Sequence, residues 1–558
     1  MTVIEIANVQ QRAASNPKLS AFVVASAGSG KTKLLTDRLL RLLLAGTAPE
    51  KILCLTYTRA AAAEMTIRLN RKLGAWVVMP ENTLAAELRA LDVLPDEKNL
   101  ILARKLFADV LDLPGGMRIG TIHAFCQSLL RRFPLEAGLS PHFEVADDLE
   151  AARRQREARE AVLADPDQRA SIFALAGETD EQSFAALTSE FAKNSGDMLQ
   201  KFSSEAITAM QRVALGAGDE TDEVLLARAV VLPREAQLRE ALLLLAERGN
   251  NSGQGWAHRA LDWLSQPKTQ RAETWDAWRA IHFTDKGKGT PLTLHNFFGK
   301  SLANEESGMR DEITTACNHI LREDEKIKAV RLAALNGHLV HLAVPILRNE
   351  RDQKKLAARL SYGDLVRYTG KLLEDPGAAW ILYKLDGGID HLLLDEVQDT
   401  APAQWEIANA IADEFFAGEG ARDVPRTIFA VGDAKQSIFS FQGADLESFE
   451  HYRAKFRDKV TGAGENFLDG QLSVSFRSTA PVLALVDAVF AQGPVRAGVC
   501  RGEETLEHGV SRAGQAGRVE LWPLTLAAQA AELPDWAVPD EYEGAESAKA
   551  ILAREIAA

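Results

Sequence analysis

Four short apolar runs, each ending in polar or glycine-rich residues, are the clearest pattern along this chain. They lie at residues 21–32, 51–58, 391–400 and 427–433. Each run is too short for a helix, and the first two lead directly into sequence rich in strong helix formers. Continuous apolar strands that alternate with helices predict a buried parallel sheet, so the predicted fold class is α/β. In such sheets ligands bind at the carboxyl ends of the strands, where all four polar clusters lie.

The middle of the chain has a different pattern. Between Phe133 and about Ser361 strand signals are scarce, and segments such as 147–164 and 223–249 have the apolar spacing of amphipathic helices. This pattern predicts a large helical insertion that divides the sheet domain in two. A basic, glycine-rich segment at 283–292 is expected to be a solvated turn, with contact to a phosphate backbone as the alternative.

A third region is expected to start near Gln471. Its residues 501–518 have the composition of a loop, 518–524 suggest a strand, and 546–558 suggest a helix. No internal repeat or low-complexity tract is evident in the sequence of the chain.

Length and composition limit the class of protein. A chain of 558 residues exceeds what one hydrophobic core serves, so several domains are expected. Four widely spaced cysteines offer no metal site and favour a reducing compartment. The N-terminus lacks the apolar core of a signal peptide and no uninterrupted apolar run is long enough to span a bilayer, so a cytoplasmic protein without a membrane partner is expected. The net charge of −14 argues against a protein that coats nucleic acid electrostatically. It does not exclude a nucleic-acid enzyme, because local grooves can be basic on an acidic body.

The first apolar run ends in the loop ASAGSGKT. Its glycines allow the backbone to wrap a phosphate, and the helix that follows presents its positive end. Lys31 can bridge the β- and γ-phosphates, and the Thr32 hydroxyl can ligate magnesium. The alternative is a chance glycine-rich turn, and alanine occupies the usual first glycine position. The candidate nucleotide-binding residues of this loop are Ala25, Ser26, Ala27, Gly28, Ser29, Gly30, Lys31 and Thr32.

The third apolar run ends in an acidic pair, within the sequence LLLDEVQD. Asp395 is placed at a strand end, where a magnesium ion bound to phosphate would find a carboxylate. Glu396 beside it can accept a proton from an attacking water. An acidic pair alone is often a solvated strand end, but together with the phosphate loop it predicts an NTPase.

The fourth run leads into VGDAKQSIFSFQGAD, residues 431–445. A strand beside the acidic pair would place Gln436 near a terminal phosphate, where an amide can sense that phosphate and orient water. Phe439 and Phe441 can present ring faces to unpaired bases. The alternative for both rings is an ordinary place in the core.

These motifs, in this order, resemble those of superfamily 1 DNA helicases of the UvrD/Rep/RecB type. The resemblance covers nearly the whole chain, and its phosphate-loop motif tolerates alanine at the first position. The wording of TIHAFCQ and DEVQDT resembles the AddA branch, the helicase–nuclease subunit of bacterial double-strand-break repair. Six segments carry the resemblance: 21–32, 52–65, 118–133, 391–400, 431–445 and 472–479.

The resemblance implies roles on the nucleotide side. Gln11 would read the adenine edge, and Asp395 and Thr32 would hold magnesium. Glu396 would act as general base and Gln436 would couple hydrolysis to movement. Arg477 would reach the γ-phosphate from a second motor domain and stabilise charge in the transition state, the alternative being a surface ion pair.

The resemblance also implies which residues contact DNA. The residues expected along the DNA track are Thr56, Thr58, Thr121, His123, Phe439 and Phe441. The alternative is that the threonines are ordinary β-branched strand residues and that the histidine is a hydrogen-bonded structural residue.

The implied architecture is a RecA-like P-loop NTPase with a helical insertion and the start of a second RecA-like domain. Residues 1–133 and 361–470 would form motor domain 1A, 134–360 the insertion 1B, and 471–558 the beginning of 2A.

The implied activity is that of an ATP-dependent 3′–5′ DNA helicase or translocase that uses ATP and Mg²⁺. Its partners would be single-stranded DNA, duplex DNA ends and an AddB-like protein. Nothing after Arg477 resembles motifs V and VI, so a fragment or a truncated product with poor turnover is expected. The alternatives are a nucleotide- and single-strand-binding module without unwinding, and an unrelated P-loop enzyme such as a small-molecule kinase. The aromatic segment and the size of the insertion disfavour the kinase.

Overall fold

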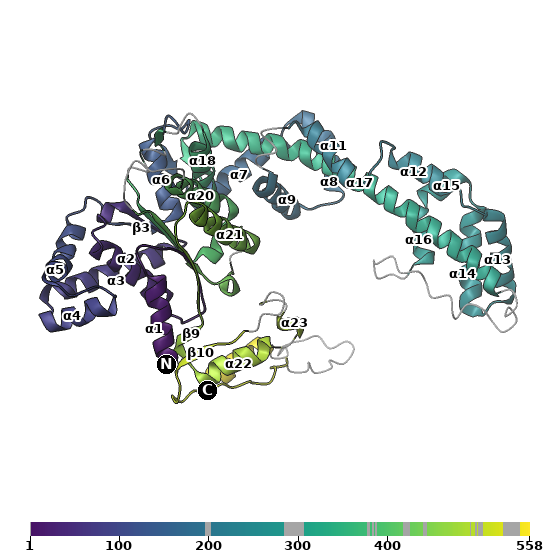
Figure 1. The fold of residues 1–558 in the computed structure, drawn as a ribbon. Coiled ribbons are helices and arrows are strands. Elements are labelled where there is room, and N and C mark those ends of the chain that lie inside the picture. The colour runs from purple at the N-terminus through teal and green to yellow at the C-terminus, as the bar shows by residue number, and fades with distance from the viewer. Residues whose placement is uncertain are drawn as a thin grey trace, which may run out of the picture. The chain divides into compact units, whose positions relative to one another are not determined.

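The computed structural model divides the chain into two compact units (Figure 1). The sheet unit comprises Met1–Phe143 and Tyr362–Ala558, and the helical unit comprises Glu144–Ser361. The assignment of these units to motor domains and insertion remains a prediction. The structure describes all residues except 1, 196–201, 284–305, 376–379, 382–383, 385–387, 417–424, 439–442, 492, 497–498, 500–505, 528–546 and 558. The predicted turn at 283–292 therefore lies almost wholly outside the described residues.

The centre of the sheet unit is a six-stranded parallel sheet in the order β3-β2-β6-β7-β1-β8. The four runs predicted as strands become its four central strands, which confirms the predicted α/β class with a RecA-like parallel sheet. The two edge strands, β3 and β8, were not predicted. The strands are β1 (Ser20–Ala25), β2 (Ile52–Thr56), β3 (Arg118–Thr121), β6 (His391–Asp395), β7 (Thr427–Gly432) and β8 (Phe467–Leu472).

Helices cover both faces of this sheet (Figure 1). On one face lie α2 (Lys31–Leu44), α3 (Arg59–Val78), α4 (Glu81–Ala90) and α5 (Glu97–Leu111). On the other lie α6 (Ile122–Arg132), α18 (Tyr362–Glu374), α20 (Pro402–Phe416) and α21 (Leu446–Gly462). The first helix, α1 (Val3–Ala14), begins with a capping box between Thr2 and Glu5.

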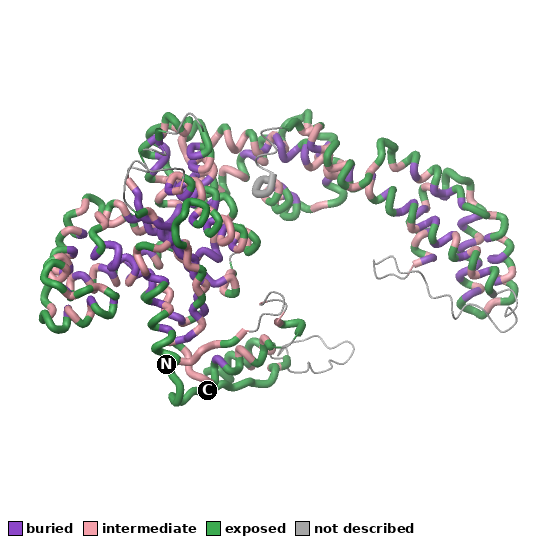
Figure 2. The backbone as a smooth tube through the Cα atoms, in the orientation of Figure 1, coloured by how far each residue is buried: buried purple, intermediate pink, exposed green. Residues whose placement is uncertain are grey.

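The core of the sheet unit is continuous across the central strands and the leucine-rich face of α2. Val23 and Phe429 from the sheet, Leu39 from α2 and Trp76 from α3 are all completely buried in one cluster. Figure 2 shows this burial concentrated in the strands and the inner sides of the helices. Apolar side chains all along a parallel strand are what a sheet covered on both faces requires.

The part of the sheet unit after β8 contains a second, two-stranded parallel sheet of β9 (Val474–Thr479) and β10 (Gly509–Arg512), with α22 (Ala480–Phe490), α23 (Gly493–Arg496) and α24 (Ala548–Ala557). The helix predicted at 546–558 is confirmed. The strand predicted at 518–524 is wrong, and β10 lies instead inside the segment expected to be a loop. Residues 518–524 pair with no strand among the described residues, and Leu521 and Leu524 are 98% and 86% exposed.

The helical unit confirms the predicted helical insertion. Its only described strands are the two-residue pair β4 (Glu144–Val145) and β5 (Arg359–Leu360). Its helices are α7 (Asp148–Leu163), α8 (Arg169–Ala176), α9 (Glu181–Ser195), α11 (Ser204–Ala214), α12 (Asp222–Ala229), α13 (Glu235–Arg248), α14 (Asn251–Ser265), α15 (Lys268–Glu273), α16 (Trp275–His282) and α17 (Glu306–Leu356).

The 51-residue helix α17 organises this unit. It packs against α7, α8, α9, α11, α12 and α13, so its apolar positions are the shared core of the surrounding helices. Among the described helices, α17 alone is long and apolar enough to cross a membrane by length and composition. Its packing explains that composition, because a long helix covered by several others needs apolar residues on several faces.

Candidate nucleotide and DNA site

The phosphate loop between β1 and α2 has the backbone that a phosphate cradle needs. Gly28 and Gly30 have φ angles of 77° and 90°, in the left-handed region that favours glycine. A Cβ on Gly28 would lie 2.7 Å from Ser475 Oγ and 2.8 Å from Arg477 Cβ. The N–H of Phe476 also donates to the carbonyl of Gly28 at 2.8 Å. Strand β9 therefore packs directly against the loop, and only glycine fits at that contact.

The rest of the loop is anchored on the sheet. Ala25 is buried at the end of β1, and the N–H of Ser26 donates to the carbonyl of Leu472 in β8 at 2.9 Å. Ala27 is exposed at the tip of the loop. The hydroxyl of Ser29 is buried and has no hydrogen-bond partner among the described residues. A buried, unpaired hydroxyl inside a glycine-rich loop is what a site for polar oxygens would contain.

Gln11 on α1 lies against this loop although it is distant in sequence. It is 4% exposed, and its Nε2 donates to the carbonyl of Ser29 at 3.0 Å. Lys33 Nζ donates to Gln11 Oε1 at 3.1 Å. The amide is therefore held beside the loop, and its reading of adenine remains a prediction. The role of Lys33 as a second contact was missed by sequence reasoning.

Arg38 fixes α1 and the turn before β1 to the helix that follows the phosphate loop. This fully buried side chain donates to the carbonyls of Asn16 and Leu19 at 2.6 Å each and to Thr427 Oγ1 at 2.9 Å. Burial, with a smaller contribution from Arg41, lowers the pKa of Arg38 to about 9. The only sign of these contacts in the sequence was an arginine within a leucine-rich helix.

The acidic pair meets the phosphate loop directly. Lys31 Nζ and Glu396 Oε2 are 2.7 Å apart, across 365 positions of sequence. Glu396 has a φ of 51°, a conformation that costs a non-glycine residue on the order of 1–3 kcal/mol. Burial and the neighbouring Glu396 raise the pKa of Asp395 to about 7, although Lys31 and the N–H of Glu396 act in the opposite direction. The strand end thus concentrates negative charge beside one lysine.

These groups fit a nucleotide with a magnesium ion. Burial and Glu396 also raise the pKa of Asp399, because carboxyl groups are crowded here and a bound cation would relieve that crowding. Magnesium prefers oxygen ligands and keeps several waters, with one or two carboxylates and substrate phosphates as partners. Asp395 and Thr32, the second residue of α2, supply that donor chemistry. Among the described residues no group of three or more acidic, histidine or cysteine side chains is arranged to hold a metal ion.

Gln436 lies in a short turn after β7. Its Nε2 donates to Asp433 Oδ2 at 2.7 Å, so the amide is held by the carboxylate that directly follows the strand. Its role in coupling remains a prediction. Phe439 and Phe441 lie outside the described residues.

The threonines predicted to contact DNA have structural tasks in this structure. Thr56 is 3% exposed and donates to the carbonyl of Thr58 at 2.9 Å. Thr58 accepts from the N–H of Ala61 and caps α3, while Thr121 accepts from the N–H of Ala124 and caps α6. Capping accounts for two of the three threonines, and their contact with DNA remains a prediction.

His123 belongs to an aromatic and cationic cluster at this edge of the sheet. Its ring makes an edge contact with Tyr362, with ring centroids 5.2 Å apart, and Arg59 Nη2 donates to the Tyr362 hydroxyl at 2.9 Å. Burial and Arg59 lower the pKa of His123, which favours the neutral ring. Tyr362 is 38% exposed and was missed by sequence reasoning.

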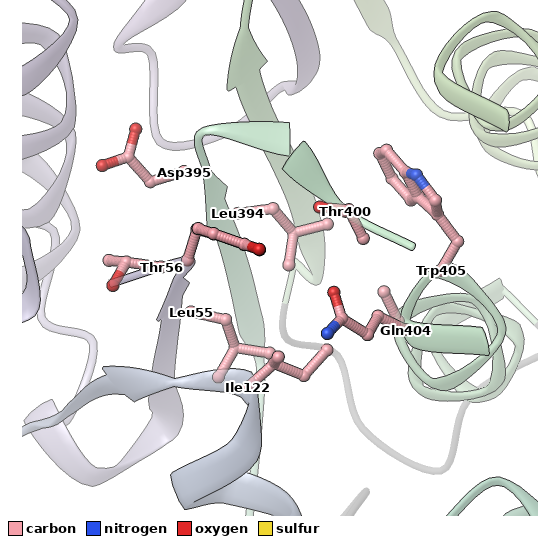
Figure 3. A pocket seen from close by; sticks show the side chains of 10 residues that line it. Leu55, Thr56, Ile122, Leu394, Asp395, Thr400, Gln404 and Trp405 are labelled. Atoms are coloured by element: carbon pink, nitrogen blue, oxygen red, sulfur yellow. The ribbon is translucent and has the colours of Figure 1, made fainter. Parts of the chain in front are cut away.

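A pocket joins the two sides of the site at the ends of β2 and β6 (Figure 3). Figure 3 shows Asp395 and Thr56 on the opposite side of the pocket from Gln404 and Trp405. The residue predicted to bind metal and a residue predicted to contact DNA therefore line the same hollow. Its lining residues are Leu55, Thr56, Tyr57, Ile122, Leu394, Asp395, Thr400, Gln404, Trp405 and Ala408.

Arg477 lies on β9, the strand that packs against the phosphate loop. The residue is exposed, and no ion pair joins it to another described side chain. A surface ion pair therefore does not account for Arg477, and its reach toward a phosphate remains a prediction.

A family model described as the UvrD/REP helicase N-terminal domain matches residues 7–457. Three similar curated proteins are each described as an ATP-dependent helicase/nuclease subunit. The protein of Lactobacillus helveticus is 26% identical over 86% of this chain and 40% of its own length. That of Pediococcus pentosaceus is 26% identical over 87% and 38%, and that of Desulforudis audaxviator 28% over 86% and 39%. The chain thus spans about two-fifths of the length of the curated relatives it matches.

Proposed function

We propose that this chain, which belongs to the UvrD/REP helicase N-terminal domain family, binds ATP with Mg²⁺ and uses its hydrolysis to move along single-stranded DNA in the 3′–5′ direction. The contact of Lys31 with Glu396 at 2.7 Å is the observation that carries this proposal. It brings a phosphate-loop lysine and a strand-end carboxylate into one site, with Asp395 beside them. A loop for phosphate and carboxylates for metal and water are the parts that phosphoryl transfer needs.

Each of these residues has a task that its geometry supports. Lys31 can leave Glu396 for a phosphate oxygen, because both partners are anions that compete for one ammonium. Glu396 is then free to accept a proton from an attacking water. Asp395 and Thr32 would hold Mg²⁺, which supplies charge neutralisation at the transferred phosphoryl group. Arg477, beside the loop, would add a further positive charge.

The DNA side of the proposal rests on the strand ends next to the nucleotide side. Tyr362 and His123 would offer ring faces to bases, and Arg59 would offer a positive charge to the phosphate backbone. This combination of groups is typical of single-strand binding. We also propose that Phe439 and Phe441 stack on bases.

The wider role follows from the relatives rather than from the geometry. By analogy with the proteins described as ATP-dependent helicase/nuclease subunits, we propose action on duplex DNA ends in double-strand-break repair, in the cytoplasm, with an AddB-like partner.

Substitution of the central ion pair tests the proposed activity. We expect Lys31→Ala to lower single-strand-stimulated ATP turnover by about 100-fold or more, because a charge that stabilises the phosphoryl group is removed. Glu396→Gln should lower turnover to a similar extent while retaining nucleotide binding, because only the base is lost. The measurement is phosphate release with and without oligo(dT), together with binding of a fluorescent ATP analogue.

Lys72→Ala is the matched control. It removes an ion pair of similar length, with Glu87 at 2.8 Å, from a half-exposed position elsewhere in the sheet unit. Turnover should be unchanged in that variant. Full activity in Lys31→Ala or Glu396→Gln would contradict these roles. A chain that binds nucleotide and oligo(dT) without turnover would support the binding-module alternative instead.

A further inference from the structure

The last two residues of the acidic motif, Gln398 and Asp399, are buried without a role in the proposed chemistry. They are only 3% and 7% exposed. Gln398 Nε2 donates to Glu396 Oε2 at 2.8 Å and to Asp399 Oδ2 at 3.1 Å. Its Oε1 accepts from the N–H of Asp433 at 2.9 Å. One amide therefore joins the proposed general base to the first residue after the neighbouring strand.

The connection continues into the turn that carries Gln436. Asp433 is 2% exposed, and its Oδ2 accepts from Gln436 Nε2 at 2.7 Å. An unbroken series of polar contacts thus runs from Lys31 through Glu396, Gln398 and Asp433 to Gln436. Every contact in the series is 2.7–2.9 Å long, which leaves little slack for one group to move without its neighbour.

Gly432 makes this close approach possible. A Cβ at that position would lie 2.6 Å from Gln398 Oε1 and 2.8 Å from Val397 Cγ2. Gly432 has an ordinary strand backbone, so the missing side chain is needed for space rather than for a special φ angle. The absence of a side chain at Gly432 therefore leaves the space that Gln398 occupies.

Asp399 fixes the other side of the Gln398 amide. Its Oδ2 accepts from Gln398 Nε2 at 3.1 Å, and its Oδ1 is buried without a hydrogen-bond partner among the described residues. Burial and Glu396 raise the pKa of Asp399, whereas the side chain of Gln398 and the N–H of Ile438 lower it. The side chain of Gln398 therefore lies between two carboxylates and the N–H of Asp433, the residue that begins the segment 433–438.

We propose that Gln398 and Asp399 form a clasp that transmits the state of the nucleotide site to the turn at 433–438, with Gln398 as the positioning residue. This inference rests on the proposed function, because it requires that ATP and DNA both bind. When Lys31 leaves Glu396 for a phosphate oxygen, the amide of Gln398 is the remaining side-chain donor to Glu396 Oε2 among the described residues. The carboxylate and the amide then adjust together, and the amide pulls on the backbone of Asp433.

The test measures coupling rather than turnover. The equilibrium affinity of the chain for fluorescein-labelled oligo(dT) is measured with and without Mg²⁺ and ATPγS, and the ratio of the two affinities is the readout. In the wild-type chain we expect a ratio of about fivefold or more, a typical coupling between two sites. Linkage requires the same ratio when ATPγS binding is measured with and without oligo(dT).

Two variants alter the clasp at its two sides, Gln398 in the turn after β6 and Gly432 at the end of β7. Gln398→Met keeps the volume of the side chain and removes its hydrogen bonds, and Gly432→Ala displaces Gln398 without changing a polar group. In both we expect the ratio to fall to within about twofold of one, while each ligand alone still binds. Gly470→Ala in β8 is the matched control, because its Cβ would meet Val23 at an ordinary 3.6 Å and touches no clasp residue. That variant should keep the wild-type ratio.

A merely structural role for Gln398 would lower thermal stability and leave the ratio unchanged, and that result would overturn the clasp. A wild-type chain that binds both ligands with a ratio of one would overturn it as well. Failure of the wild-type chain to bind ATPγS would instead overturn the proposed function, and the clasp with it. If Gln398→Met does not fold, Gly432→Ala decides the question.

Discussion

The sheet unit and the helical unit bury charge in opposite ways. At the strand ends of the sheet unit, burial and Glu396 raise the pKa of Asp395 to about 7. In the helical unit, burial also raises the pKa of Glu235, but hydrogen bonds from Arg271 and Arg239 outweigh it and leave that pKa below its ordinary value. In the sheet unit, Asp395 and Glu396 lie beside one lysine, Lys31. In the helical unit, Glu235 pairs with two arginines, Arg271 and Arg239.

The same contrast separates two buried arginines, one from each unit. Arg38 of the sheet unit has carbonyl and hydroxyl acceptors, and burial lowers its pKa to about 9. Arg271 of the helical unit makes a bidentate pair with Glu235 at 3.0 and 3.1 Å. The helical unit thus pairs this arginine with a carboxylate of its own, in the two-bond geometry that gives strength and specificity. The sheet unit leaves charge that a metal ion and a phosphate can relieve, and this is the usual signature of a functional site.

Removal of the buried cation of the helical unit should have the largest effect on stability. Arg271→Met removes one donor from Glu235 and one from the carbonyl of Leu264, which both keep Arg239, and it removes the donor to the carbonyl of Gln266. We expect the free energy of unfolding of this unit to fall by about 3 kcal/mol, the lower end for a broken buried pair, because Arg239 still faces Glu235. Hydrogen exchange of peptides from α13–α16 measures this effect. Arg228→Met, at a side chain that is 50% exposed, is the control and should change it by less than about 0.5 kcal/mol.

Replacing Asp395, the buried carboxylate of the sheet unit, by a neutral side chain should raise the free energy of unfolding instead of lowering it. A shift of the Asp395 pKa from 3.8 to about 7 corresponds to about 4 kcal/mol of destabilisation above pH 7, at about 1.4 kcal/mol per pH unit. Partial solvent access reduces this, so Asp395→Asn should raise the free energy of unfolding by roughly 2 kcal/mol at pH 8.

The pH dependence of that gain gives a second check. The folded protein binds the Asp395 proton more tightly than the unfolded chain, so wild-type stability falls as the pH rises from about 4 to 7. The advantage of Asp395→Asn should therefore shrink as the pH is lowered from 8 toward 4. Urea unfolding in EDTA, followed by hydrogen exchange of β6 and β7, measures it. A destabilised Asp395→Asn would contradict the contrast between the units.

The central strands could be predicted from the sequence because they are buried on both faces and therefore apolar throughout. Strand β8, with the sequence FLDGQL, could not, since an edge strand that is only partly buried tolerates Asp469 and Gln471. The false strand at 518–524 shows the converse error. Apolar residues alone do not form a strand when no neighbouring strand is available for backbone hydrogen bonds.

The positions of Lys31, Asp395 and Glu396 could be expected from the rule that parallel strands bring their carboxyl ends to one edge. The contacts of Gln398 with Asp433, and of His123 with Tyr362, could not, because they join distant positions without a local period to reveal them. Gln398 belongs to the acidic motif LLLDEVQD, and Asp433 belongs to the segment 431–445. Their pairing depends on the register of β6 against β7, and only the structure contains that register.

The smallest expected effect isolates charge from volume in the helical unit. Glu235→Gln keeps the shape of the side chain and its oxygen acceptor, but Arg271 and Arg239 lose their anion. We expect the free energy of unfolding to fall by about 1.5 kcal/mol, the lower end for hydrogen bonds to a charged group, because Glu235 is 25% exposed. Glu220→Gln is the matched control, because Glu220 also pairs with an arginine at 3.0 Å but is 46% exposed, and it should change stability by less than about 0.5 kcal/mol. Since the same change from carboxylate to amide stabilises the sheet unit at Asp395 and destabilises the helical unit at Glu235, equal signs at the two positions would show that burial alone, and not the supply of cations, governs both.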